Sequence, residues 1–324
     1  NDKIDLTQAE AIADLIAAET DAQAKQAMRQ LQGEVGRIYD NWRHAIIKLL
    51  AHLEAYIDFP EEDLPADLCA SAQANIDDLL GQIKYYLDDN HMAEKLRDGF
   101  YVTIIGAPNV GKSSLLNQLS GRDLAIVSNV AGTTRDVIEA HLNIKGLPVI
   151  IADTAGIRES SDDIEEEGVK RALARAAEAD VKILLFDATA PDPKQLSMID
   201  DKTILVMNKI DLAVISNDVE LARHKPILVS IKNNQNIDKI LSAIHSKITD
   251  HVMIKNTEPI LSRARHRQAL QECFDHLKRF NLHKELELAV EDLRLAANAI
   301  GKITGRIDVE DVLDVIFSSF CIGK

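Results

Sequence analysis

The chain has 324 residues, which is long enough for two or three domains with hydrophobic cores of their own. It carries 37 Lys and Arg against 52 Asp and Glu, and the net charge of -15 disfavours broad, non-specific binding to nucleic acid. Three cysteines are too few for a disulfide framework, so we expect a reducing, cytoplasmic location. No membrane span is expected, because the sequence contains no run of about 18 uncharged apolar residues. The chain starts at Asn1 rather than Met, and we expect that an N-terminal part is missing.

The first part of the chain, residues 1–99, is predicted to be helical. Apolar residues recur at spacings of three and four between residues 28 and 56 without a proline, which predicts one long helix. Trp42 and Tyr56 belong to this apolar stripe and are expected in the core. Another helix is expected to start at Thr7, where Thr7 and Glu10 form a capping-box pattern, and a third helical stretch is expected at residues 66–97.

The pattern changes at Phe100, where a short buried strand runs into a glycine loop. Further apolar runs alternate with helical or polar stretches, as in a parallel sheet with crossover connections, and lie at residues 149–152, 181–186, 203–207 and 226–229. After about residue 251 the pattern returns to helices. We therefore predict an α/β plus all-α fold, in which an α/β domain at residues 100–252 is inserted into a discontinuous helical-bundle domain made of residues 1–99 and 253–324.

Residues 106–113 match the pattern G-x-x-x-x-G-K-S, at the junction between the first strand and the following helix. The backbone N–H groups of such a loop and the helix N-terminus can bind a chain of phosphates. Lys112 is expected to reach the β and γ phosphates, and the Ser113 hydroxyl to bind Mg²⁺. A chance glycine turn is the alternative, which the position of the loop disfavours. The predicted phosphate-binding residues are Asn109, Val110, Gly111, Lys112, Ser113 and Ser114.

A second motif, Asp153-Thr-Ala-Gly156, follows another predicted strand. It places the Asp153 carboxylate at the carboxyl end of that strand and the Gly156 N–H near the γ phosphate. Both residues are therefore predicted to contact the nucleotide.

Two further motifs predict that the base is guanine. In Asn208-Lys209-Ile210-Asp211, the Asp211 carboxylate can accept from N1–H and from the 2-amino group of guanine, a pattern that adenine cannot supply. Ser230-Ile231-Lys232 occupies the place of the loop whose backbone N–H contacts guanine O6, although Ile231 stands where a small residue is expected. The four motifs together predict a Ras-like P-loop GTPase domain that binds GTP or GDP. The predicted base-binding residues are Asn208, Lys209, Asp211, Ser230 and Ile231.

The group that orients the attacking water is left open by the residues themselves. Ile157 stands where Ras-like proteins have a glutamine, and isoleucine cannot position water by hydrogen bonding. Polar candidates lie nearby, although most of them fit a solvated acidic loop equally well: Arg158, Glu159, Asp162, Asp163, Glu165, Glu166 and Glu167. Arg135 is the arginine nearest the switch region, and it can equally pair with a surface acid.

A monovalent cation is a second possible source of positive charge beside the phosphates. Oxygen atoms of Asn109 and of residues 128–136 could hold such a cation, which would act as an arginine finger does. The alternative is that Asn109 only forms hydrogen bonds within its own loop.

Two other features have a functional and a structural interpretation. The basic cluster of Arg263, Arg265, His266 and Arg267 could meet tRNA, but a solvated helix face is the preferred interpretation. Cys321 is a thiol in the C-terminal tail, and its four-residue ending does not match a prenylation motif.

The chain resembles the MnmE (TrmE) family of tRNA-modification GTPases. The G-domain stretches that carry the resemblance are Gly106-Ala-Pro-Asn-Val-Gly-Lys-Ser, Gly132-Thr-Thr-Arg-Asp and Asp153-Thr-Ala-Gly-Ile-Arg. The ends of the chain are more specific to the family, with Leu6-Thr-Gln-Ala-Glu-Ala-Ile-Ala-Asp-Leu-Ile near the start and Phe320-Cys-Ile-Gly-Lys at the finish.

This resemblance implies a GTPase that acts with a flavoprotein partner, MnmG, on tRNA. The two proteins add a carboxymethylaminomethyl or aminomethyl group to C5 of the wobble uridine. The resemblance also implies that G domains pair as a homodimer when GTP and potassium bind, which activates hydrolysis. The missing front portion would be the family's folate-binding domain, which carries the one-carbon donor.

The resemblance also assigns metal ligands. Potassium would be bound by the Asn109 side chain, the carbonyl groups of Ser128 and Val130, and an oxygen of Thr133. Ser128 stands where a threonine is usual, which is harmless to a backbone ligand. Thr134 would join Ser113 on Mg²⁺.

Catalytic roles follow from the same resemblance. Glu165, twelve positions after Asp153, matches the family's catalytic glutamate, which orients the attacking water through a second water. Cys321 matches a terminal cysteine that is thought to lie near the one-carbon chemistry. With Lys112, these are the predicted catalytic residues.

Two other functions compete with tRNA modification. An Era-like ribosome-assembly switch would predict an RNA-binding module after the G domain, and neither a GXXG-type loop nor a basic appendix is found there. A scaffold with a vestigial pocket is disfavoured because Lys112, Ser113, Asp153 and Asp211 are all present.

Overall fold

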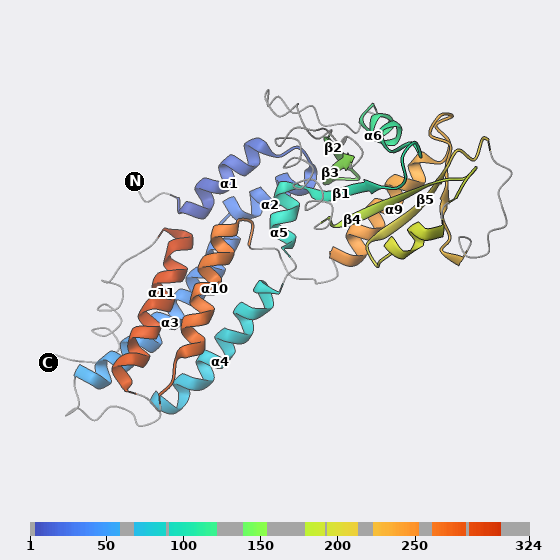
Figure 1. Cartoon of the computed structure of the whole chain (residues 1–324). Coiled ribbons are helices and arrows are strands. Elements are labelled where there is room, and N and C mark those ends of the chain that lie inside the picture. Colours follow the sequence, from blue (N-terminus) through green and yellow to red (C-terminus); the bar gives the residue numbers. More distant parts are fainter. Residues whose placement is uncertain are drawn as a thin grey trace, which may run out of the picture. The chain divides into compact units, whose positions relative to one another are not determined.

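The computed structural model describes residues 4–58, 68–88, 91–121, 139–153, 179–191, 193–212, 223–252, 261–282 and 285–305 (Figure 1). The chain divides into two compact units. The helical unit comprises Asn1–Ala18, Ala24–Glu94 and Thr257–Lys324, and the α/β unit comprises Glu19–Gln23 and Lys95–Asn256. Because the middle of the chain forms the α/β unit and both ends form the helical unit, the predicted fold class is confirmed.

The helices before the first strand and after the α/β unit are α1 (Leu6–Ala17), α2 (Asp21–Leu31), α3 (Glu34–Asp58), α4 (Leu68–Leu87), α5 (Met92–Asp98), α10 (Ala264–Arg279) and α11 (Leu286–Thr304). The prediction of one helix over residues 28–56 was wrong. Gly33 adopts a φ of 78°, and this left-handed conformation separates α2 from α3. The apolar spacing continues across the break, so periodicity alone does not reveal it. The stretch predicted at residues 66–97 is likewise two helices, α4 and α5.

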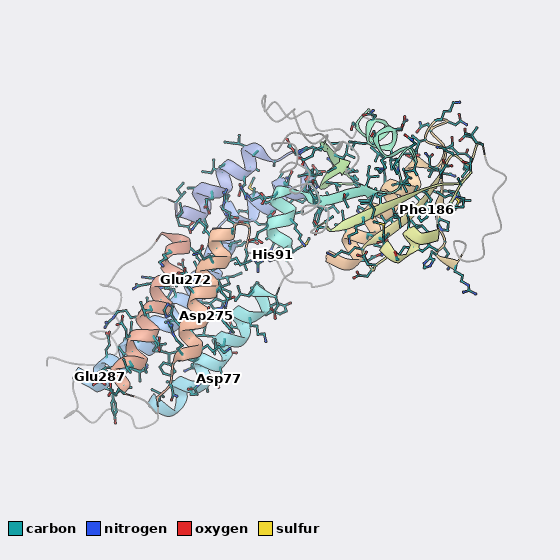
Figure 2. The ribbon with its side chains drawn as sticks, in the orientation of Figure 1. Asp77, His91, Phe186, Glu272, Asp275 and Glu287 are labelled. Carbon is teal, nitrogen blue, oxygen red and sulfur yellow. The ribbon has the colours of Figure 1, made fainter. Side chains whose placement is uncertain are left out.

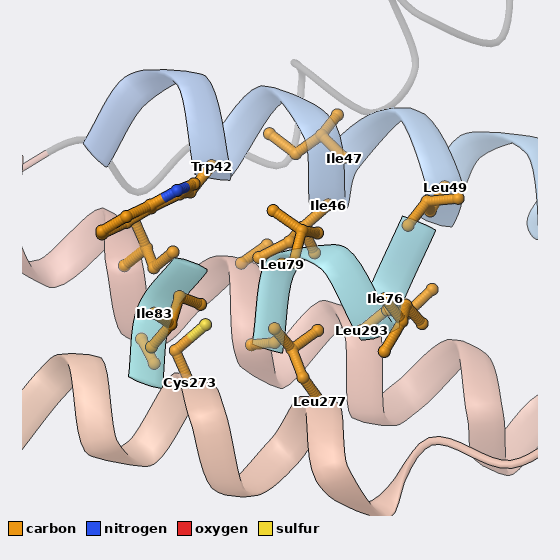
Figure 3. Packing of buried hydrophobic residues seen from close by; sticks show 14 of the residues in the cluster. Trp42, Ile46, Ile47, Leu49, Ile76, Leu79, Ile83, Cys273, Leu277 and Leu293 are labelled. Carbon is orange, nitrogen blue, oxygen red and sulfur yellow. The ribbon is translucent and has the colours of Figure 1, made fainter. Parts of the chain in front are cut away.

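The core of the helical unit lies among α3, α4, α10 and α11 (Figure 3). Trp42 is only 3% exposed and donates from Nε1 to Gln82 Oε1 at 2.9 Å, so its predicted place in the core is confirmed. Tyr56 is 46% exposed, and its predicted burial was wrong. It lies near the end of α3, where the adjacent Ala55 occupies the buried face instead. Cys273 of α10 lies in the same core, and its burial raises the pKa of its thiol well above the ordinary value.

In the described residues, the sheet of the α/β unit has six strands: β1 (Phe100–Ile105), β2 (Glu139–Ile144), β3 (Leu147–Asp153), β4 (Val181–Asp187), β5 (Thr203–Asn208) and β6 (Ile227–Leu228). Their order is β2-β3-β1-β4-β5-β6, and every neighbouring pair is parallel except β2 with β3. The sequence analysis did not predict β2. Only every second residue of β2 is buried, which gives a weaker signal than the continuous apolar runs of the central strands.

The parallel strands end together at one edge of the sheet. β1 lies between β3 and β4. After β1 the chain forms β2 and β3 on one side of it, and then β4, β5 and β6 on the other side. Such a reversal of strand order is a topological switch point, where ligands bind in folds of this kind. The glycine loop follows β1, while Asp153, Asp187 and Asn208 end β3, β4 and β5. Helix α6 (Lys112–Ser120) packs on β2 and β3, and α9 (Ile237–Val252) packs on β4 and β5.

Side chains divide between core and surface as expected (Figure 2). Phe186 of β4 is 1% exposed in the α/β unit, whereas the acidic side chains of Asp77, Asp275 and Glu287 are exposed on the helical unit. None of the helices in the described parts of the chain combines the length and apolar character that a bilayer crossing requires.

Candidate nucleotide-binding site

The loop after β1 depends on two glycines. Gly106 has a φ of 148°, and a Cβ atom at this position would lie 2.4 Å from the carbonyl oxygen of Leu185. Gly111 has a φ of 107°, and its Cβ atom would lie 2.6 Å from Asn208 Nδ2. Because both contacts are far too short for carbon, only glycine fits, and the backbone can come close to its neighbours.

Lys112 folds back over this loop. Its Nζ donates to the carbonyl oxygens of Gly106 and Ala107, each at 2.8 Å, and the residue is 7% exposed. The positive charge is therefore held beside the backbone that is predicted to bind phosphate. Because the Lys112 side chain is already ordered, ligand binding does not have to reduce its conformational entropy.

Helix α6 begins directly after the loop. Its N-cap is Gly111, which makes no side-chain capping hydrogen bond. The start of a helix carries a partial positive charge, so an anion is favoured at this position. Ser113 and Ser114 lie in the first turn with exposed side chains. The loop and the helix start thus place partial positive charge where the phosphate group is predicted to bind.

Asn208 joins the phosphate loop to the loop after β6. Its Nδ2 donates to the carbonyl oxygen of Val110 at 2.9 Å, and its Oδ1 accepts from the Ile231 N–H at 3.1 Å. The side chain is buried, with an exposed fraction of 4%. Asn208 was predicted to contact the nucleotide, and in the structure it holds the two binding loops together.

Asp211 is oriented by Ser230. The Ser230 hydroxyl donates to Asp211 Oδ1 at 2.7 Å and also accepts from the Asn233 N–H at 3.2 Å. Ser230 is fully buried, whereas Asp211 is exposed. The buried Ser230 hydroxyl therefore fixes the Asp211 carboxylate, which stays exposed and accessible to a ligand, as recognition of guanine requires.

Lys209 lies between these two residues and is paired with an acid from the neighbouring strand. Its Nζ lies 2.5 Å from Asp187 Oδ2. Burial alone would raise the pKa of Asp187, but hydrogen bonds from Lys209 and Thr189 outweigh it and hold that pKa below its usual value. Asp187 is thus a carboxylate at neutral pH, and Lys209 has a fixed partner.

The structure brings together only part of the predicted site. The phosphate loop, Asn208, Lys209, Asp211, Ser230 and Ile231 meet at the carboxyl edge of the sheet. Asn109 is exposed there with a φ of 61°. For Asp153 only the backbone at the end of β3 is described. The other predicted site residues lie outside the described residues: Ser128, Val130, Thr133, Thr134, Gly156, Glu165 and Cys321.

Asp187 is the residue of this region that the sequence analysis missed. Asp187 directly ends a buried apolar strand, and this same pattern predicted a site residue at Asp153. Unlike Asp153, Asp187 belongs to none of the four nucleotide motifs.

The basic cluster at the start of α10 is not a solvated face, so that interpretation was wrong. Arg265 donates to both carboxylate oxygens of Glu10 at 2.6 Å, and the fully buried His266 lies 2.9 Å from Glu10 Oε2. Arg263 donates to Asp14 at 2.7 Å, and Arg267 pairs with Glu94. These charges are satisfied inside the helical unit.

Glu10 is the centre of that cluster. Its burial opposes ionisation, but hydrogen bonds from His266 and Arg265 outweigh this and lower the pKa of Glu10 to about 2. Burial also lowers the pKa of His266, which favours a neutral ring. The fold therefore supplies opposite charge for the arginines without a ligand.

A mostly parallel sheet with a glycine loop and a helix N-terminus at its switch point, and with a fixed carboxylate beside them, defines a P-loop protein of the GTPase class. The family model described as "MnmE helical domain" matches residues 6–321 of the chain. The chain belongs to the MnmE family.

Curated relatives carry the name of the same family. The tRNA modification GTPase MnmE of Paramagnetospirillum magneticum is 48% identical over 327 residues, which cover 100% of this chain and 74% of that protein. The protein of the same name from Rickettsia rickettsii is 49% identical over 330 residues, with the same coverage. Among solved structures, the G domain of the T. maritima FeoB iron transporter is 27% identical, with coverage of 46% of this chain and 98% of that chain and a TM-score of 0.35.

Proposed function

We propose that this chain binds GTP and hydrolyses it to GDP and phosphate as a component of a tRNA-modifying enzyme. The observation that carries the proposal is the exposed Asp211 carboxylate, fixed by the buried Ser230 hydroxyl at 2.7 Å and connected through Asn208 to the phosphate loop. A carboxylate in this position accepts from two N–H groups of guanine, and adenine offers no such pair.

The phosphate chain would lie on the loop of residues 106–113. Its glycine backbone allows close approach, α6 points its N-terminus at the loop, and the Lys112 charge is already in place. Ser113 has an exposed hydroxyl in the first turn of α6, which fits a ligand of Mg²⁺. Thr134 would be the second protein ligand, as the family resemblance implies.

For hydrolysis we propose the two features that the family resemblance implies. Glu165 would orient the attacking water, since Ile157 has no hydrogen-bonding group for that task. A potassium ion would supply positive charge beside the phosphates, held by Asn109, Ser128, Val130 and Thr133. The exposed Asn109 side chain on the phosphate loop is in keeping with such a ligand.

Within tRNA modification, we propose the specific reaction of the family. The chain would act with the flavoprotein MnmG on C5 of the wobble uridine, and its G domains would pair when GTP and potassium bind. Cys321 would serve the one-carbon chemistry, with a folate-binding domain as the source of the carbon. Family membership and two relatives named tRNA modification GTPase support this assignment.

The decisive experiment compares nucleotides and cations on the purified chain. Calorimetry with Mg²⁺ should show binding of GDP and no comparable binding of ADP, and equal affinities would overturn guanine recognition. GTP turnover should be faster in potassium than in sodium chloride, and equal rates would remove the cation from the mechanism.

Glu165→Ala tests the water-orienting role. The variant should bind GDP as the unaltered chain does, while turnover should fall by at least about tenfold. The matched control is Glu167→Ala, two positions along the same acidic stretch. Unchanged turnover in Glu165→Ala would exclude Glu165 from catalysis.

A further inference from the structure

Asp187 uses its two carboxylate oxygens for different tasks. Oδ1 accepts from the Thr189 N–H at 2.9 Å and from the Thr189 hydroxyl at 2.6 Å, which closes the turn after β4. Oδ2 is left to accept from Lys209 Nζ at 2.5 Å. The carboxylate itself is therefore held in place by Thr189, and a fixed carboxylate can fix the ammonium that it binds.

Lys209 stands at a decisive position for the base. In the sequence it follows Asn208, whose side chain donates to Val110 in the phosphate loop, and it lies two residues before Asp211, whose carboxylate is proposed to bind guanine. Its φ of 66° is left-handed, so its side chain leaves the backbone in a direction unlike that of a continued strand. A lysine carries a long apolar stem below its charge, and such a stem can cover an apolar surface such as a purine ring.

We propose that Asp187 is a positioning residue for guanine binding, which acts by holding the Lys209 side chain in place before the base arrives. This inference rests on the proposed function, since it concerns the same site. Ordering a lysine side chain on binding reduces affinity, and a partner that orders it beforehand removes this cost. Asp187 belongs to none of the nucleotide motifs, so the proposal adds a residue to the site.

A comparable ion pair lies at the other end of β4 and β5 and joins Lys182 of β4 to Asp200, three residues before β5. Lys182 at the start of β4 donates to Asp200 Oδ2 at 2.7 Å, and Asp200 Oδ1 accepts from the Thr203 hydroxyl at 2.6 Å. As with Asp187, lysine and threonine hydrogen bonds outweigh burial and lower the pKa of Asp200. The two pairs have the same chemistry and lie at opposite ends of β4 and β5, so only the pair of Asp187 and Lys209 lies at the nucleotide edge.

The experiment measures GDP binding to the full chain with Mg²⁺ after Asp187→Asn and, as the control, Asp200→Asn. The asparagine keeps an oxygen for Thr189 and loses the charge that holds Lys209. Asp187→Asn should raise the Kd for GDP about fivefold, and Asp200→Asn should change it less than about twofold. Unchanged affinity in Asp187→Asn, or an equal loss in both variants, would overturn the proposal.

A double-mutant cycle with Lys209→Met shows whether Asp187 acts through Lys209. Methionine keeps an apolar stem and removes the ammonium, so Asp187→Asn should cost no further affinity in that background. Losses that add up would mean that Asp187 acts only by shaping its turn, and the proposal would be wrong. A failure of the unaltered chain to bind GDP would instead reject the proposed function, so the two failures are distinguishable.

Discussion

Each unit of the molecule carries a cluster of charged side chains, and the two clusters differ in the partners that hold them. In the helical unit, Arg265 donates to both carboxylate oxygens of Glu10 at 2.6 Å, so the positive charge is paired with a negative one. At the sheet edge of the α/β unit, Lys209 is likewise paired with Asp187, whereas Lys112 donates to two backbone carbonyl groups and the exposed Asp211 accepts from a hydroxyl. Neutral groups orient a charge without cancelling it. The comparison teaches that a charge oriented by a neutral group and left exposed, as in Asp211, indicates where a ligand can bind.

Asp211→Asn should produce the largest effect on the α/β side of this comparison. The amide places an N–H against the 2-amino group of guanine, so the Kd for GDP should rise about a thousandfold. Binding of xanthosine diphosphate should improve, because its C2 carbonyl can accept from that N–H. Calorimetry with Mg²⁺ measures both, with the exposed Asp201→Asn just before β5 as the control. A loss of less than about tenfold for GDP would contradict the assigned role of Asp211.

Glu10→Gln should have the largest effect on the helical side. It leaves Arg265 and the buried His266 without their carboxylate, and the free energy of unfolding of this unit should fall by about 3 kcal/mol. Trp42 is the one tryptophan of the chain and lies in the core of the helical unit, so its fluorescence in urea follows this unit. GDP affinity should not change. The control is Glu287→Gln on the surface, and a loss as small as that of the control would show that the cluster does not stabilise the fold.

The pH dependence of the same cluster sharpens the comparison further. Glu10 has a pKa of about 2 in the folded chain against an ordinary value of 4.5. The unfolded chain therefore binds this proton more readily, so the stability from Glu10 is fully present above pH 4.5 and is lost as the pH falls towards 2. The difference in unfolding free energy between the unaltered chain and Glu10→Gln should shrink over that range. A difference that stays constant would contradict an ionised Glu10.

Ser230→Ala should weaken the orientation of Asp211 without removing its charge. Losing this buried hydrogen bond should raise the Kd for GDP about tenfold. Ser246→Ala is the matched control, because Ser246 donates to Asp250 at 2.8 Å on the exposed face of α9. If both variants bound GDP equally well, Asp211 would not depend on Ser230 for its position.

Arg294→Ala should have the smallest effect. Arg294 donates to Glu54 at 2.6 Å, but its side chain is 51% exposed, and solvent screens such a pair. The unfolding free energy that Trp42 reports should fall by about 0.5 kcal/mol. A loss comparable to that of Glu10→Gln would mean that exposure does not separate the two kinds of ion pair.

Local patterns predicted the strand and loop elements of the nucleotide edge. The glycine loop has a strict spacing, and the central strands are continuous apolar runs, so both are visible within a few residues. The edge strand β2 escaped because only alternate residues are buried, and the break at Gly33 escaped because the apolar spacing continues past it.

Contacts between distant parts of the sequence could not be predicted in this way. Arg265 of the basic cluster of α10 pairs with Glu10, which lies 255 positions away in the sequence. A local sequence pattern cannot predict such a distant partner. The support of Lys209 by Asp187 spans 22 positions and depends on the pairing of β4 with β5. The motifs therefore identified the groups of the described site, while the contacts that orient them follow from the fold.

The amide of Asn208 has a consequence for how ligands of different size behave. One side of this amide holds Val110 in the loop predicted to bind phosphate, and the other holds Ile231 in the loop predicted to contact the base. A fragment that orders either loop will order part of the other, because both share one rigid group. Guanosine and pyrophosphate should therefore assist each other's binding, although each carries only half of the nucleotide.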